Sequence, residues 1–189
     1  MIPVLKMRLI MIESSTVKYT ICALFVAFIS ICSQIAIYIG PVPISMSLFA
    51  IFMASLLLGM KYGTISVIVY ILLGITGIPV FAGARGGFAI ILGPTGGFLI
   101  GYILCALIVG FVSSRFINKK IYMGIGMIIS VIVCYIPGIL WHYIITGNTI
   151  SMSLKLCVIP FIPGDIIKII ISLILYYKIS PRLNSIIKT

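Results

Sequence analysis

The chain has 189 residues, of which 62% are hydrophobic and only 8% are charged. A soluble domain of this size has a far more charged surface, so the composition excludes that class and predicts an integral membrane protein. The net charge of +11 is spread over basic residues that stand singly or in small groups between apolar runs. That distribution argues against nucleic-acid binding and favours topology signals and contacts with anionic lipid.

The apolar runs predict an all-α membrane protein with six transmembrane helices. A spanning helix needs about 20 apolar residues, so about six fit in the chain. The predicted helices cover residues 19–39, 44–60, 64–78, 98–114, 121–144 and 164–178. We therefore expect a single six-helix domain, 19–178, between a basic N-terminal tail, 1–18, and a basic C-terminal tail, 179–189.

The basic residues predict the orientation, because cytoplasmic segments are enriched in Lys and Arg. A cytoplasmic N-terminus leaves only Arg85 and Lys155 in outer segments. The inner segments then hold Lys6, Arg8, Lys18, Lys61, Arg115, Lys119, Lys120, Lys178, Arg182 and Lys188. Both termini are therefore predicted to be cytoplasmic.

The first predicted helix carries Ala23 and Ala27, a small-xxx-small spacing that permits close helix approach. Ser33 and Gln34 are neighbouring polar residues in its second half. Near the end of the fifth predicted helix, Trp141-His142-Tyr143 is typical of an interfacial aromatic belt. We expect His142 to lie at that interface rather than in a catalytic site.

The segment 79–97, between the third and fourth predicted helices, is too rich in Gly and Pro for a spanning helix and too apolar for a solvated loop. Irregular backbone near membrane depth is tolerated where it lies against protein or lines a cavity. We interpret the segment as a structured lid or re-entrant loop on the outer side. The alternative is an ordinary glycine-rich turn.

Asp165 is one of only two acidic residues in the chain, and it precedes Lys168 by three positions at the start of the last apolar run. Residues i and i+3 share a helix face, and an ionisable residue in a membrane segment is a candidate functional site. The pair could hold a ligand that has polar and anionic ends. The alternatives are a self-satisfied ion pair or a helix cap.

The sequence offers few residues for ATP hydrolysis, catalysis, metal binding or disulfide formation. Leu92-Gly-Pro-Thr-Gly-Gly97 lacks the spacing and the lysine of a phosphate loop, so we expect no ATPase activity. One His, two acids and five Cys without CxxC spacing argue against catalysis, a metal site and disulfides, and we expect no cofactor. The residues thus predict a small membrane-embedded binder with an outward-facing pocket.

Three stretches closely resemble the BioY family, the biotin-specific substrate-binding (S) components of energy-coupling-factor (ECF) vitamin transporters. They are Leu73-Gly-Ile-Thr-Gly-Ile-Pro-Val-Phe-Ala-Gly83, Leu92-Gly-Pro-Thr-Gly-Gly-Phe98 and Phe161-Ile-Pro-Gly-Asp-Ile-Ile-Lys168. The resemblance implies a six-helix fold and high-affinity biotin capture in a prokaryotic cell membrane. It also implies partnership with a transmembrane coupling protein and two cytoplasmic ATPase subunits.

The resemblance also implies roles for individual residues. Asp165 accepts a hydrogen bond from the ureido ring of biotin, Lys168 faces its carboxylate, and Ala23 and Ala27 contact the coupling protein. The glycine-rich loop closes over the ligand. The remaining candidate ligand-binding residues are Gln34, Phe81, Gly83, Arg85, Gly86, Gly87 and Phe88. The alternatives are core packing for Phe81 and Phe88, and a position facing solvent or lipid headgroups for Arg85.

Three other functions remain open on the sequence alone. The first is an S component for another small acid, such as lipoate. The second is an intramembrane enzyme acting on lipid or acyl substrates through His142 and Asp165. The third is a solitary channel or ion-coupled carrier that uses Asp165 as its ion site.

Overall fold

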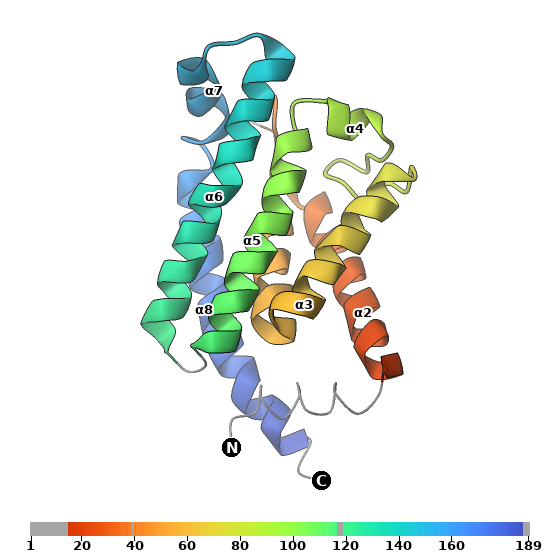
Figure 1. The fold of residues 1–189 in the computed structure, drawn as a ribbon, viewed down its shortest axis with the longest axis vertical. Helices are drawn as coiled ribbons and strands as arrows, with labels where there is room; N and C mark the ends of the chain where they lie inside the picture. The colour runs from red at the N-terminus through yellow and green to blue at the C-terminus, as the bar shows by residue number, and fades with distance from the viewer. Residues whose placement is uncertain (1–14, 39, 117–118, 187–189) are drawn as a thin grey trace.

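The fold is that of a computed structural model, which describes residues 15–38, 40–116 and 119–186. Figure 1 shows the long helices as one bundle, with α4 and α7 at what we call the upper end and the start of α2 at the lower end. The elements in chain order are α2 (Ser15–Gln34), β1 (Ala36–Ile37), β2 (Ile44–Ser45), α3 (Ser47–Ile75), α4 (Ala89–Leu92), α5 (Gly96–Arg115), α6 (Lys120–Thr146), α7 (Ile150–Cys157) and α8 (Ile162–Ile186).

Four helices within the described residues, α2, α3, α5 and α6, are long and apolar enough to cross a membrane. A fifth span results if α7 and α8, which meet at a bend of 48°, are taken together. A predominantly helical membrane fold is therefore confirmed, whereas the predicted count of six spans is not. The difference arises at α3, since the helices expected at residues 44–60 and 64–78 are counted as one element although its helical geometry is interrupted at Gly59.

A glycine bends α3 into two arms. Gly59 has φ 78° and ψ −173° inside the helix, a conformation that only glycine adopts without strain. The two arms pack closely, because a Cβ on Gly63 would lie 2.8 Å from Ser55 Cα. α5 approaches the bend equally closely, since a Cβ on Gly110 would lie 2.4 Å from Met60 Cα. Small residues thus allow these close helix contacts.

The basic side chains separate between the two ends of the bundle. The start of α2, the bend of α3 and the end of α5 lie at the lower end (Figure 1) and carry Lys18, Lys61 and Arg115. The loop that holds Arg85 and the helix that holds Lys155 lie at the upper end. This separation matches the charge pattern from which the orientation was predicted.

The interior is apolar and the outer surface is too. Two clusters fill the core, one around Phe52 and Met127, the other around Ile29 and Tyr70. Large aliphatic side chains such as Ile121 remain exposed on the outside of the bundle. An apolar exterior suits contact with lipid, which does not need a polar surface.

A short β-ribbon connects α2 to α3. β1 and β2 pair antiparallel, with Ala36 opposite Ser45 and Ile37 opposite Ile44. Ser45, at the end of the ribbon, and Ser47, which opens α3, are both buried. The ribbon therefore brings two hydroxyl groups toward the site described next.

Candidate functional site

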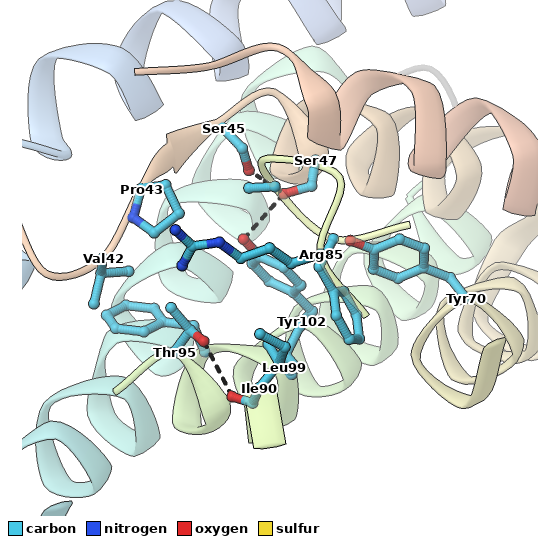
Figure 2. Close-up of a pocket in the computed structure, with 13 residues that line it drawn as sticks. Val42, Pro43, Ser45, Ser47, Tyr70, Arg85, Ile90, Thr95, Leu99 and Tyr102 are labelled. Atoms are coloured by element: carbon cyan, nitrogen blue, oxygen red, sulfur yellow. Dashed lines mark hydrogen bonds between the residues drawn. The ribbon is translucent and has the colours of Figure 1, made fainter. Parts of the chain in front are cut away.

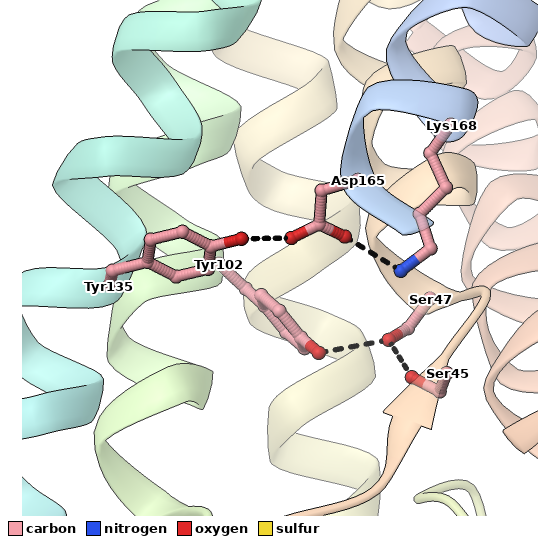
Figure 3. A network of polar contacts seen from close by, with 6 residues as sticks. All are labelled: Ser45, Ser47, Tyr102, Tyr135, Asp165 and Lys168. Atoms are coloured by element: carbon pink, nitrogen blue, oxygen red, sulfur yellow. Dashed lines mark hydrogen bonds and ion pairs between the residues drawn. The ribbon is translucent and has the colours of Figure 1, made fainter. Parts of the chain in front are cut away.

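Two residues near the start of α8 form a buried ion pair. Asp165 and Lys168 are only 3% and 4% exposed, and the Lys168 ammonium donates to Asp165 Oδ1 at 2.8 Å. The Tyr135 hydroxyl of α6 donates to the other carboxylate oxygen, Oδ2, at 2.6 Å (Figure 3). The positive end of the helix dipole also favours a carboxylate at this position. The predicted shared face of Asp165 and Lys168 is thus present, with Tyr135 as a partner that the sequence did not reveal.

Three hydroxyl groups form a second polar network nearby (Figure 3). Ser45 Oγ and Ser47 Oγ share a hydrogen bond of 2.6 Å, and Ser47 Oγ lies 3.0 Å from the Tyr102 hydroxyl of α5. Hydroxyl groups both donate and accept, so this network can match either kind of ligand atom. Nothing in the sequence singled out these residues, because isolated Ser and Tyr are ordinary members of apolar runs.

The two networks border adjoining cavities. The larger cavity is lined by Tyr70, Phe81, Arg85, Thr95 and Leu99 among others (Figure 2). The smaller one reaches Tyr135, Asp165 and Lys168. Their shared wall consists of Val42, Pro43, Ser45, Phe98 and Tyr102. Mostly apolar walls with a few converging polar groups are typical of small-molecule sites.

The glycine-rich segment 79–97, called the covering segment below, covers the larger cavity. Phe81 and Arg85 form a backbone bridge through two hydrogen bonds, 2.9 and 3.3 Å long. The turn between them needs left-handed backbone at Gly83, with φ 76°, and at Ala84, with φ 54°. The Phe81 ring is buried and stands edge-on to Tyr70 at 5.5 Å. A buried aromatic anchor thus fastens the segment to the second arm of α3.

The predicted loop residues divide into two groups. Phe81 and Arg85 line the larger cavity. Gly83, Gly86 and Gly87 line neither cavity and instead shape the segment. A Cβ on Gly86, for example, would lie 2.4 Å from the Ile78 carbonyl oxygen. Phe88 is 59% exposed and borders neither cavity, so the structure does not bring it to the candidate site.

Gln34 holds the covering segment rather than lining a cavity. Its Nε2 donates to the carbonyl oxygens of Pro79 at 3.3 Å and Phe81 at 3.2 Å. Its Oε1 accepts from the Ala84 N–H at 2.8 Å. Next to it, the Ser33 hydroxyl donates to the Val80 carbonyl. The end of α2 therefore fastens the backbone of the segment at residues 79–84.

Replacing Gln34 with Ala should loosen this fastening. The change removes hydrogen bonds that contribute about 1 kcal/mol each, less where water competes. We expect faster hydrogen exchange at Ala84 and faster proteolysis between residues 79 and 87, with the helices unchanged. Thr20→Ala is the matched control, since Thr20 bonds only to Thr16 within α2. Equal exchange at Ala84 in both variants would contradict the role of Gln34.

The predicted interfacial position of His142 is wrong. Its side chain is completely buried, and Nδ1 lies 2.9 Å from Ser153 Oγ, so it joins α6 to α7. It lines neither cavity and is not placed with Asp165 in a catalytic arrangement. Its neighbour Trp141 donates its indole N–H to the Gly93 carbonyl at 3.0 Å. His142 is buried because α7 folds back over the end of α6 and covers the side of α6 that carries this residue.

Ala23 and Ala27 are both exposed on α2. A strip of small side chains therefore lies on the outer surface of the bundle. Within the described residues, no group of three or more His, Cys, Asp or Glu side chains is arranged to hold a metal ion.

The sequence profile of the BioY family matches residues 7–185. The chain belongs to the BioY family. A probable biotin transporter BioY from Pyrococcus horikoshii is 39% identical over 151 residues, which cover 80% of this chain and 88% of the relative. The biotin transporter BioY from Thermotoga maritima is 32% identical over 157 residues, covering 82% and 91%.

A solved structure has the same fold as this BioY chain. The S component for biotin from an ECF-type ABC transporter superimposes with a TM-score of 0.79 at 32% identity, over 87% of this chain and 91% of that one. The family resemblance expected from the three motifs is thus confirmed. The helices and the family together identify a multi-pass membrane protein.

Proposed function

We propose that this BioY chain binds biotin and serves as the substrate-binding component of an ECF-type vitamin importer. The names of the relatives support a transporter rather than an enzyme. The observation that carries the proposal is the buried cluster of Asp165, Lys168 and Tyr135 at one end of an apolar cavity. Such a cavity accommodates a ligand that has an apolar body and one strongly polar end.

The ureido ring of biotin has two N–H donors and one carbonyl acceptor, and the cluster matches both kinds of group. Asp165 accepts from a ureido N–H, and Lys168 donates to the ureido carbonyl. Because Lys168 lies 2.8 Å from Asp165, we assign both to the ureido end, in place of the separate carboxylate contact that the family resemblance implied for Lys168. Phe98 and Phe161, stacked at 5.9 Å, face the bicyclic body. Each hydrogen bond to a charged group is worth about 1.5–3 kcal/mol.

The proposed topology has six membrane-crossing segments, namely α2, the two arms of α3, α5, α6 and α8. Both termini face the cytoplasm of a prokaryotic cell, and the covering segment faces outward. The exposed Ala23 and Ala27 dock on a transmembrane coupling protein, which two cytoplasmic ATPase subunits drive. Small side chains favour this use, since they allow another helix to approach closely.

Calorimetric titration of the purified, detergent-solubilised chain tests the proposal, with biotin as ligand and lipoate as control. We expect tight one-to-one binding of biotin and no response to lipoate. A response to lipoate alone would indicate that lipoate, not biotin, is the ligand, and the proposed transporter role would remain. Failure of a folded, ligand-stripped sample to bind either compound would reopen the enzyme and the ion-coupled carrier. Turnover that is lost in His142→Ala would then support the enzyme. Proton- or sodium-driven uptake into partner-free vesicles would support the carrier.

A further inference from the structure

Arg85 is the only basic side chain that lines the larger cavity. Figure 2 shows its guanidinium group extending over the cavity toward Pro43 and Val42. The backbone bridge to Phe81 fixes the residue in the covering segment. The guanidinium group lies over the Tyr38 ring, with 6.0 Å between the Arg85 Cζ atom and the ring centroid. The arginine is thus held at the open end of the site.

The charge of Arg85 has no acidic counterpart in the described part of the chain. Asp165 is the only acid there, and its two oxygens already accept from Lys168 and Tyr135. The Arg85 guanidinium group makes no ion pair and no hydrogen bond with any residue that the structure describes. Its five N–H donors, arranged as a fork that fits a carboxylate, are therefore available over the cavity.

The two ends of the site consequently differ in charge. At the buried end the Lys168 cation is compensated by Asp165, and a second carboxylate there would be repelled by the first. At the open end the Arg85 cation is uncompensated and exposed to water, so an anion need not lose all its hydration. A ligand with a neutral polar head and an acidic tail therefore has one favourable direction of entry.

We propose that Arg85 binds the carboxylate of the ligand and selects acidic over neutral forms of it. The proposal rests on the proposed function, since it takes biotin as the ligand with its ureido ring at Asp165 and Lys168. The valerate chain then runs from the smaller cavity past their shared wall into the larger one. Tyr38 is a positioning residue that limits the directions in which the arginine points.

The test compares biotin with its neutral methyl ester in calorimetric titrations of the detergent-solubilised full chain. We expect the unmodified chain to bind the ester about tenfold more weakly than biotin, as the loss of one charged hydrogen-bonded contact predicts. Arg85→Gln should weaken biotin binding about tenfold and change the affinity for the ester by no more than about twofold. Lys155→Gln is the matched control, because it removes the same charge from an exposed position on α7 that borders neither cavity.

Each result has a distinct meaning. Unchanged biotin affinity in Arg85→Gln would overturn the proposal, as would equal losses for biotin and the ester, which indicate a role in cavity shape alone. Equal losses in Arg85→Gln and Lys155→Gln would reduce the effect to general attraction of an anion. An unmodified chain that binds neither compound would instead contradict the proposed function. Retained ester binding shows that the Arg85→Gln chain is folded.

Discussion

Replacing Lys168 with Met is expected to weaken biotin binding at least about tenfold and to destabilise the fold. The binding loss follows from the missing charged hydrogen bond to the ligand. The loss of stability follows because Asp165, only 3% exposed, keeps Tyr135 as its single partner. Removing one member of a buried ion pair typically costs about 3–5 kcal/mol. Calorimetric titration measures the first effect and calorimetric unfolding in detergent the second.

A double variant separates the two effects. Asp165→Asn combined with Lys168→Met removes both charges and leaves an amide that still accepts from Tyr135, so much of the stability should return while biotin binding stays weak. Lys178→Met is the control, since it removes the same charge from an exposed position of the same helix. Unchanged affinity in Lys168→Met would show that the pair is purely structural.

Replacing Gly74 with Ala is expected to release the covering segment. The new Cβ would lie 2.0 Å from Phe81 Cζ, so the ring must leave its place between Gly74 and Tyr70. The Gly74 carbonyl also accepts from the Gly87 N–H at 2.7 Å, so a shift of the helix disturbs a second attachment. Overpacking of this kind costs about 1–3 kcal/mol. Because Phe81 lines the larger cavity, biotin affinity should fall together with protection of residues 79–87 from proteolysis.

A smaller side chain at position 81 should repair this damage in part. In Gly74→Ala combined with Phe81→Leu, the shorter side chain leaves room for the added methyl group, and protection of the segment should partly recover. Gly124→Ala is the matched control, since its Cβ meets only Leu173 Cδ1 at 3.6 Å, an ordinary contact. Proteolysis of Gly74→Ala at the rate of the Gly124→Ala control would mean that Phe81 does not anchor the segment.

Local patterns in the sequence predicted the parts of the site that lie close together along the chain. Asp165 and Lys168 are three residues apart on one helix, so their shared face follows from helix geometry. Phe81 and Arg85 belong to one unusual Gly-rich segment and could be selected from its composition. The long apolar helices followed from hydrophobicity in the same way.

The rest of the site depends on contacts between distant segments. Tyr135 meets Asp165 only because α6 packs beside α8, and Tyr102 meets Ser47 only because α5 packs beside α3. Each is an ordinary residue of an apolar run until those helices are placed. The role of Gln34 was missed for the same reason, since its partners lie 45 to 50 residues further along the chain.

The single tryptophan of the chain gives the covering segment an optical signal of its own. The Trp141 indole N–H donates to the Gly93 carbonyl, and the neighbouring Gly97 leaves room for the indole, since a Cβ there would lie 2.4 Å from Trp141 Cβ. Indole emission shifts in wavelength when its hydrogen bond and its exposure to water change. Opening and closing of the segment should therefore be visible in the intrinsic fluorescence of the unlabelled protein, without a second tryptophan to obscure it.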